Sequence, residues 1–149
     1  MPATTSAGAL TITRIFNARR ERVFSAWTTA EALKQWHSPD PMRVREATVD
    51  LRVGGRYRIV MAGPDGTERI VGGTYREIDS PQRLVYTWQW ETTPGFPETD
   101  VIVEFTAQGN ATEVRVTHTG IPDENSRSQH ERGWMGCTAR LETFFTTAG

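Results

Sequence analysis

Three histidines and a single cysteine are the residues of this 149-residue chain best suited to acid–base or nucleophilic chemistry. His118 ends a segment that alternates apolar and polar residues, and His130 begins one with helical spacing, so both imidazoles are predicted near the same end of the fold. If they face one cavity, they could bind a polar group of a ligand or transfer protons, since imidazole titrates near neutral pH. The alternative, preferred for each, is a hydrogen-bonded structural histidine at the end of an element.

Metal and nucleophilic chemistry find little support in the sequence. The histidines show none of the HxH, HxxxH or HExxH spacings that bring two imidazoles to one metal ion, and His37 is placed in the distant segment HSPDP. Cys137 lies among apolar residues of a predicted helix, where a thiol is usually an inert core group. No GxSxG motif occurs, and GPDGT and RVGG fall between predicted strands, which favours turns over phosphate loops. We therefore predict no catalytic residue, no metal and no cofactor, and a binding protein is preferred to an enzyme.

The elements that must position these side chains follow from hydrophobic periodicity. Alternation predicts a strand over residues 9–16 and six later strands, at roughly 42–50, 55–62, 68–79, 82–91, 99–107 and 112–119. The breaks between them are turn sequences, and their short lengths predict antiparallel neighbours. Between the first two strands, RRERVFSAWTTAEALKQW has apolar residues at helical spacing, which predicts two short helices. HSPDP must then be a loop, because its two prolines disfavour helix.

A long final helix is predicted from Asn125 to Thr146, with one bulky stripe. The stripe comprises His130, Trp134, Cys137, Leu141 and Phe144. Such a helix is about 30 Å long, enough to lie across a whole sheet. Gly133 and Gly136 flank Trp134, and each costs up to about 1 kcal/mol in a helix interior. Close backbone approach or room for a neighbouring group would explain them.

Strand parity collects the bulky side chains on one face of the sheet, which the final helix is predicted to cover. A cavity between a curved sheet and one helix suits an apolar or ring-bearing small molecule. The residues predicted to line it are Tyr57, Ile59, Met61, Trp88, Trp90, Val103, Phe105, Val116, His118, His130, Trp134, Cys137 and Leu141. Phe96, in the loop TTPGFP, is predicted to gate its entrance.

Length and charge narrow the class of protein. The chain fits one domain, predicted over residues 9–149 after a flexible tail at 1–8. A net charge of -1 disfavours nucleic-acid binding. The sequence contains no run of about 18 apolar residues that could insert into a membrane, and its N-terminus lacks the pattern of a secretory signal. A single cysteine allows no internal disulfide. A cytoplasmic location is therefore expected. By parity Arg43, Arg45, Arg56 and Arg58 lie on the outer face, as a solvated surface or a site for an acidic partner.

The order of these elements and five segments of the chain resemble a known family. The segments are RRERVFSAWTTAEALKQW, DLRVGGRYRIVMAGPDGT, GTYREIDSPQRLVYTW, TEVRVTHTGIP and HERGWMGCTARLETF, and the resemblance runs from about Leu10 to Phe145. They are similar to the START or Bet v 1-like superfamily, also called SRPBCC, and within it to bacterial homologues of the C-terminal domain of the heat-shock-protein-90 ATPase activator. The resemblance implies an α+β helix-grip fold, in which a curved seven-stranded antiparallel sheet wraps around a long C-terminal helix. Relatives usually have an aromatic residue and a glycine where this chain has His37 and Ser38.

The residues and the resemblance together imply a non-catalytic carrier or sensor that holds a hydrophobic or amphipathic small molecule between sheet and helix. One open alternative is a cyclase- or hydratase-type enzyme, as found elsewhere in the superfamily, with His118, His130 and Tyr57 as proton-transfer groups. Another is a module that contacts a chaperone or other protein, although 149 residues are expected to leave no space for the N-terminal domain of the eukaryotic co-chaperone. A homodimer is compatible with all three.

Overall fold

The computed structural model describes residues 8–147, so the predicted tail lies outside the described residues except for Gly8. The chain begins with β1 (Leu10–Phe16), followed by two short helices, α1 (Arg20–Thr28) and α2 (Ala30–Trp36). The later elements are β2 (Arg43–Val49), β3 (Arg56–Ala62), β4 (Glu68–Asp79), β5 (Arg83–Trp90), β6 (Thr99–Gln108), β7 (Ala111–Thr119) and α3 (Glu124–Thr147). This is the order predicted from hydrophobic periodicity.

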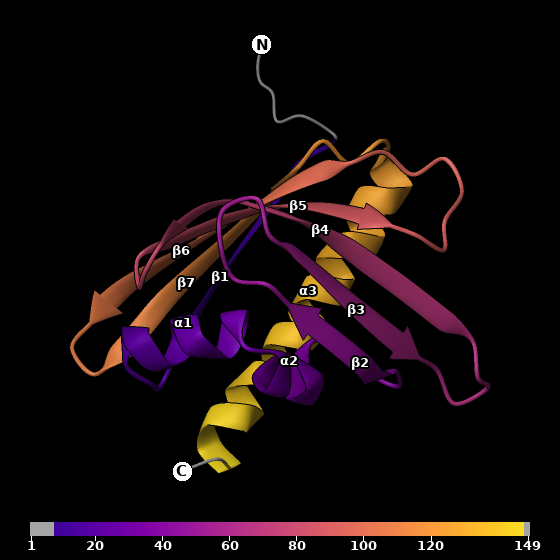
Figure 1. Ribbon diagram of the computed structural model, residues 1–149. Helices are drawn as coiled ribbons and strands as arrows, with labels where there is room; N and C mark the ends of the chain where they lie inside the picture. Colours follow the sequence, from indigo (N-terminus) through magenta and orange to yellow (C-terminus); the bar gives the residue numbers. More distant parts are fainter. Residues whose placement is uncertain (1–7, 148–149) are drawn as a thin grey trace.

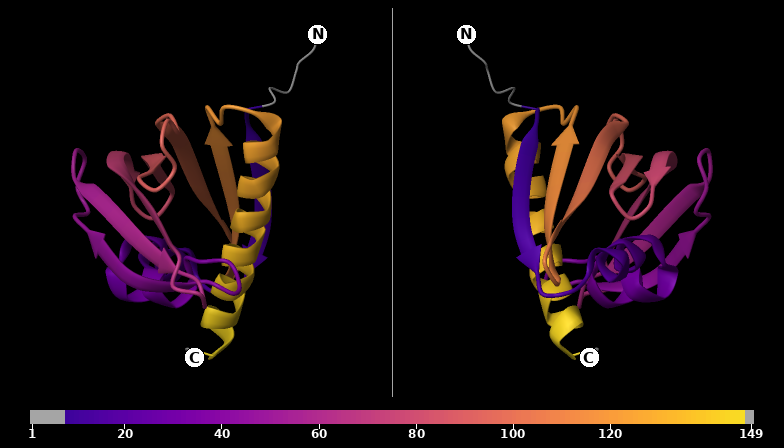
Figure 2. Two further views of the ribbon diagram at one scale, coloured as in Figure 1. Left: turned by 90° about the vertical axis from the view of Figure 1, so that its right-hand side faces the viewer. Right: turned by 90° about the vertical axis from the view of Figure 1, so that its left-hand side faces the viewer.

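All seven strands form one antiparallel sheet in the order β1-β7-β6-β5-β4-β3-β2. Six strands follow as a meander, while β1 pairs with β7 at the far edge and places Leu10 opposite His118. Register shifts in the β2–β3 and β4–β5 pairs add to the curvature of the sheet. Figure 1 shows the curled sheet above α1 and α2, and the side views in Figure 2 show α3 running alongside its β1 edge. The expected α+β helix-grip fold is therefore confirmed.

The concave face of the sheet carries the core, as strand parity predicted. Tyr57, Ile59, Leu84 and Tyr86 are all less than 5% exposed. On α3 the buried stripe runs through Trp134, Cys137 and Leu141 but ends in Phe145, which is 5% exposed and packs against Phe16 with ring centroids 5.6 Å apart. The predicted Phe144 is only partly buried, because a step of four residues from Leu141 continues the stripe better than a step of three.

The loop between α2 and β2 is fastened to α3 by one arginine. Arg140 donates to the Ser38 hydroxyl (2.6 Å) and the Met42 carbonyl (2.7 Å), and it also pairs with Asp40. A Cβ atom at Gly136 would lie 3.1 Å from the Pro39 ring, so the glycine permits this close approach. The loop that follows Trp36 thereby becomes a wall between the sheet and the final helix.

Candidate functional site

A cavity of about 110 Å³ lies between the sheet, the loop after α2 and the first turns of α3. Its walls combine aromatic and sulfur-containing side chains with a few polar ones. The lining residues are His37, Pro39, Met42, Met61, Arg69, Trp88, Trp90, Gln129, His130, Gly133, Trp134 and Cys137. Arg69 and Gln129 are exposed, so the cavity reaches the surface beside them.

Three tryptophans contribute to the apolar wall. Trp88 on β5 packs against Trp134 on α3 with ring centroids 5.1 Å apart, and Trp90 meets Trp88 edge to face at 5.5 Å. Trp88 and Trp90 share a face because they are two residues apart on one strand. Trp134 reaches them from the opposite side, since α3 lies across the concave face. The surface that results suits the flat faces of an apolar ring.

His118 is fully buried, and both of its ring nitrogens are engaged. The indole N–H of Trp134 donates to Nδ1 (3.1 Å), so the proton of the neutral ring lies on Nε2. Nε2–H donates to the Thr99 hydroxyl (2.8 Å), which in turn donates to the Trp88 carbonyl (2.7 Å). Burial, with a smaller effect of His130, lowers the pKa of His118 to about 3. His118 is therefore a neutral structural residue, and it does not line the cavity.

His130 lines the cavity but also uses both ring nitrogens. The indole N–H of Trp90 donates to Nε2 (2.9 Å), which leaves the proton on Nδ1, where it is donated to the Ser126 carbonyl (2.7 Å). Burial lowers the pKa of His130, the bond to Ser126 partly offsets this, and the nearby charge of Arg69 lowers it further. Phe96 stacks on the ring at 5.5 Å and does not itself line the cavity, so it supports the wall.

His37 is the cavity histidine that lacks a full set of hydrogen bonds. It is 2% exposed, and its ring centroid lies 5.7 Å from that of Trp88 and 5.8 Å from that of Trp134. Nδ1 of His37 has no hydrogen-bond partner among residues 8–147. Burial lowers the pKa of His37 to about 4. The prediction that His37 lies far from the other histidines was wrong, because Arg140 draws its loop onto α3.

A second buried polar atom without a partner belongs to the same wall. The structure leaves three such side-chain atoms in the part of the chain it describes, and Nε1 of Trp88 and Nδ1 of His37 are two of them. The remaining indole N–H groups described are all hydrogen-bonded, to Tyr86, Ala26, His130 and His118. Buried polar atoms in folded proteins are normally paired, so each of these two atoms retains the capacity for a hydrogen bond to a group bound beside it.

The structure brings some of the predicted site residues together and separates others. Those that line the cavity are Met61, Trp88, Trp90, His130, Trp134 and Cys137. Tyr57 and Ile59 border a separate void of only about 10 Å³. The remainder are packed in the core away from the cavity, namely Val103, Phe105, Val116, His118 and Leu141.

Six lining residues were not predicted: His37, Pro39, Met42, Arg69, Gln129 and Gly133. Strand alternation could have identified Arg69, because it lies two residues from the buried Val71 on the same strand and therefore faces inward. Gln129 and Gly133 directly precede the predicted stripe residues His130 and Trp134 on α3. No pattern in the sequence indicated the three loop residues, because their position depends on the tether to Arg140.

The cavity wall offers no activated nucleophile. Cys137 is buried, and burial raises the pKa of its thiol to about 12, so it stays protonated at neutral pH. The Tyr57 hydroxyl donates to the Thr87 carbonyl at 2.6 Å, away from the cavity. Across residues 8–147, no group of three His, Cys, Asp or Glu side chains is arranged to hold a metal ion.

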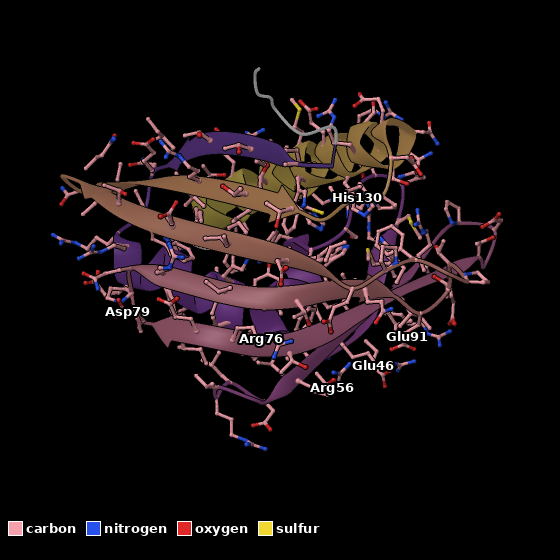
Figure 3. The ribbon with its side chains drawn as sticks, turned by 90° about the horizontal axis from the view of Figure 1, so that it is seen from above. Glu46, Arg56, Arg76, Asp79, Glu91 and His130 are labelled. Atoms are coloured by element: carbon pink, nitrogen blue, oxygen red, sulfur yellow. The ribbon has the colours of Figure 1, made fainter. Side chains whose placement is uncertain are left out.

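The outer face of the sheet carries both signs of charge. Figure 3 shows this face, with Arg56, Arg76, Glu46 and Glu91 labelled. Arg58 forms two hydrogen bonds with Glu91, at 2.9 and 3.1 Å, and Arg45 pairs with Glu68. Arg43 pairs with Asp40, whereas Arg56 bonds the Thr74 hydroxyl. Three of the four arginines considered for an acidic partner are therefore already paired with acids of this chain.

Comparison with known proteins identifies the family. The model of the Activator of Hsp90 ATPase homolog 1-like protein family matches residues 17–146. A solved protein from Chromobacterium violaceum superposes with a TM-score of 0.86 at 23% identity, over 93% of this chain and 97% of that one. The AHSA1 protein from Silicibacter pomeroyi gives 0.85 at 23% identity, over 95% and 99% of the two chains. An HSP90 activator from Plasmodium falciparum gives 0.73 at 24% identity, over 93% and 96%.

These structural likenesses establish the fold. No curated protein sequence matches the chain significantly. None of the helices within residues 8–147 is long and apolar enough to cross a membrane.

Proposed function

Because the chain belongs to the Activator of Hsp90 ATPase homolog 1-like protein family, whose curved sheet grips a long helix, we propose that it binds a small amphipathic molecule in the cavity beneath that sheet. Its role is that of a non-catalytic carrier or sensor. The observation that carries the proposal is a tryptophan-lined cavity in which two wall residues, His37 and Trp88, each retain a buried polar atom without a partner.

The size of the cavity limits what it can hold. An engineered protein cavity of about 150 Å³ accommodates benzene, so about 110 Å³ with an opening at the surface suits a body the size of one ring. Burial of such a body removes on the order of 100 Å² of apolar surface from water, which contributes roughly 2.5 kcal/mol. Larger molecules would have to extend past Arg69 and Gln129.

The unpartnered atoms favour an amphipathic ligand over a purely apolar one. The indole N–H of Trp88 can only donate, so its partner must be an acceptor such as a hydroxyl, carbonyl or carboxylate oxygen. Nδ1 of His37 can accept or donate according to tautomer. A buried polar atom without a partner costs about 1–3 kcal/mol, and a ligand that supplies one recovers part of that free energy.

Proton-transfer catalysis through His118 and His130 is not supported by the geometry. Each imidazole is fixed in one neutral tautomer by bonds at both nitrogens, and only His130 reaches the cavity. A general acid or base needs a nitrogen within hydrogen-bond reach of its substrate. The ion pairs on the outer face likewise leave the acidic-partner interpretation without a specific observation in its favour.

Native mass spectrometry of the purified protein and a thermal-shift screen of single-ring alcohols, amides and acids test the proposal. Gly133→Leu is the blocking variant, because a Cβ there meets no atom within 4 Å and the residue lines the cavity. Met135→Leu, on the exposed side of the same helix, is the matched control. We expect stabilisation by at least one compound in the wild type and in Met135→Leu, and its loss in Gly133→Leu. Failure of every compound to stabilise the wild type would contradict the proposal.

A further inference from the structure

Among residues 8–147, Arg69 is the only one that lines the cavity and carries a formal charge at neutral pH, since none of the other lining residues is acidic and both lining histidines have lowered pKa values. It lies on β4 directly opposite Met61 of β3, in phase with Val71, which is fully buried. Its side chain therefore projects toward the concave side of the sheet. There its guanidinium carbon lies 4.3 Å from the centre of the Trp90 ring.

The guanidinium of Arg69 has no acidic partner among the described residues. Arginines of the outer face differ in this respect, since Arg45 and Arg58 pair with Glu68 and Glu91. Stacking on an indole occupies the flat face of the guanidinium and leaves the N–H groups along its edge free to donate. Trp90 is itself held by its bond to His130, so the stacked arginine stays at the rim of the cavity.

We propose that the ligand is a small organic acid, whose single carboxylate pairs with Arg69 at the rim while its ring-sized apolar body lies against Trp88 and Trp134. This inference rests on the function proposed above and adds the charge and chemical class of the ligand. A carboxylate matches the fork of one guanidinium, because two parallel N–H donors meet two oxygens. A phosphate monoester carries nearly two charges and three acceptor oxygens, for which the lining provides only one cation.

The rim is the place where a charge can be bound without a large desolvation penalty. Arg69 is exposed, whereas His37 and Trp88 are 2% and 5% exposed. An ionised group placed deep in the cavity would lose its hydration without a counter-charge. The ligand therefore orients with its carboxylate outward and its apolar body inward.

Equilibrium titrations with benzoate, benzamide, benzyl alcohol and phenyl phosphate, followed by intrinsic tryptophan fluorescence, test this assignment. These probes share one ring and differ in charge. Arg69→Gln removes the guanidinium at the cavity. Arg56→Gln is the matched control, because it removes the same charge from the outer face, where the Arg56 side chain donates to the Thr74 hydroxyl. Arg69→Lys keeps the charge without the fork, and a melting curve of each variant verifies folding.

We expect benzoate to bind the wild type and Arg56→Gln about tenfold more tightly than benzamide. This factor corresponds to the lower end of the free-energy range of a hydrogen bond to a charged group. Arg69→Gln should remove that preference while benzamide binding stays within about twofold, and Arg69→Lys should retain only part of it. Equal binding of benzoate and benzamide to the wild type would overturn the carboxylate assignment and leave the small-molecule function standing. Tighter binding of phenyl phosphate than of benzoate would also overturn it. If none of the probes binds saturably, both proposals fail.

Discussion

At the scale of single residues, the histidines show how burial and hydrogen bonding decide chemistry that residue type leaves open. His118 and His130 were candidates for proton transfer, yet each has one tautomer imposed by an indole donor. The preference for structural histidines at both positions agrees with these bonds. His37 received no role from the sequence, although it is the histidine with a free ring nitrogen beside the cavity.

Stability should rise with pH through the weakly acid range. The folded-state pKa values of His37 and His118 are about 4 and about 3, below the value of 6.5 for an unperturbed histidine. Between these values and 6.5 the unfolded chain binds protons that the folded chain excludes, so stability is lost as the pH falls. Each histidine contributes up to about 1.4 kcal/mol per pH unit in that window. Urea unfolding at several pH values from about 4.5 to 7.5 measures this slope.

The variant His37→Phe measures how much of this pH dependence of stability comes from His37 alone. It keeps a ring at the position, removes one titrating group and removes the unpartnered nitrogen. We expect a pH slope lower by up to about 1.4 kcal/mol per unit, and a gain of about 1 kcal/mol at neutral pH from the loss of a buried unsatisfied group. An unchanged slope would show that His37 already titrates normally in the folded chain.

At the scale of elements, the two glycines of α3 serve different purposes, and their alanine variants should reveal it. A Cβ at Gly133 meets nothing within 4 Å, whereas one at Gly136 lies 3.1 Å from the Pro39 side chain. Gly133→Ala should therefore raise the free energy of unfolding by up to about 1 kcal/mol through helix propensity alone. Gly136→Ala should raise the free energy of unfolding clearly less, because the loop that contains Pro39 must move away from the added Cβ atom. Urea denaturation of both variants makes the comparison, and an equal or larger gain for Gly136→Ala would contradict the close approach.

Arg140 should control the loop that carries His37. Its side chain is 18% exposed, and it bonds Ser38, Met42 and Asp40 across 98 to 102 residues of sequence. Arg140→Leu should increase amide hydrogen exchange in residues 37–42 and lower stability by about 1–3 kcal/mol, the usual cost of leaving buried acceptors unpaired. Exchange in β6 and β7 serves as the internal reference. Unchanged protection of the loop would show that Pro39 packing alone holds it.

At the scale of the whole molecule, most of the architecture could be predicted from the sequence. Strand alternation, turn residues and helical spacing gave each element within a few residues, because one side of every strand and of α3 is buried. The resemblance implied that all seven strands form one sheet, but the pairing of β1 with β7 was not predicted, because local periodicity cannot show which strands from distant parts of the chain are neighbours.

The cavity itself was only half predictable, for physical reasons. Parity identifies residues that face inward, yet it cannot separate those that fill the core from those that border a void. Phe105 and Trp88 have the same inward pattern, but Phe105 packs against Phe24 and Trp27 and leaves no space beside it. The loop wall depends on a contact between Ser38 and Arg140, which no local pattern encodes. Arg69 could have been found by extending the parity argument to β4.

The five tryptophans allow ligand binding in the cavity to be measured in one experiment. Each indole N–H has a distinct environment: Trp27 donates to Tyr86, Trp36 to Ala26, Trp90 to His130 and Trp134 to His118, while Trp88 has no partner in the described part of the chain. A heteronuclear NMR titration of ¹⁵N-labelled protein with benzoate and benzyl alcohol, assigned through single Trp→Phe variants, reports on all five. We predict saturable shifts of the Trp88 and Trp90 signals, with the Trp36 signal unmoved. No saturable shift with either compound, or equal shifts of all five signals, would contradict this prediction.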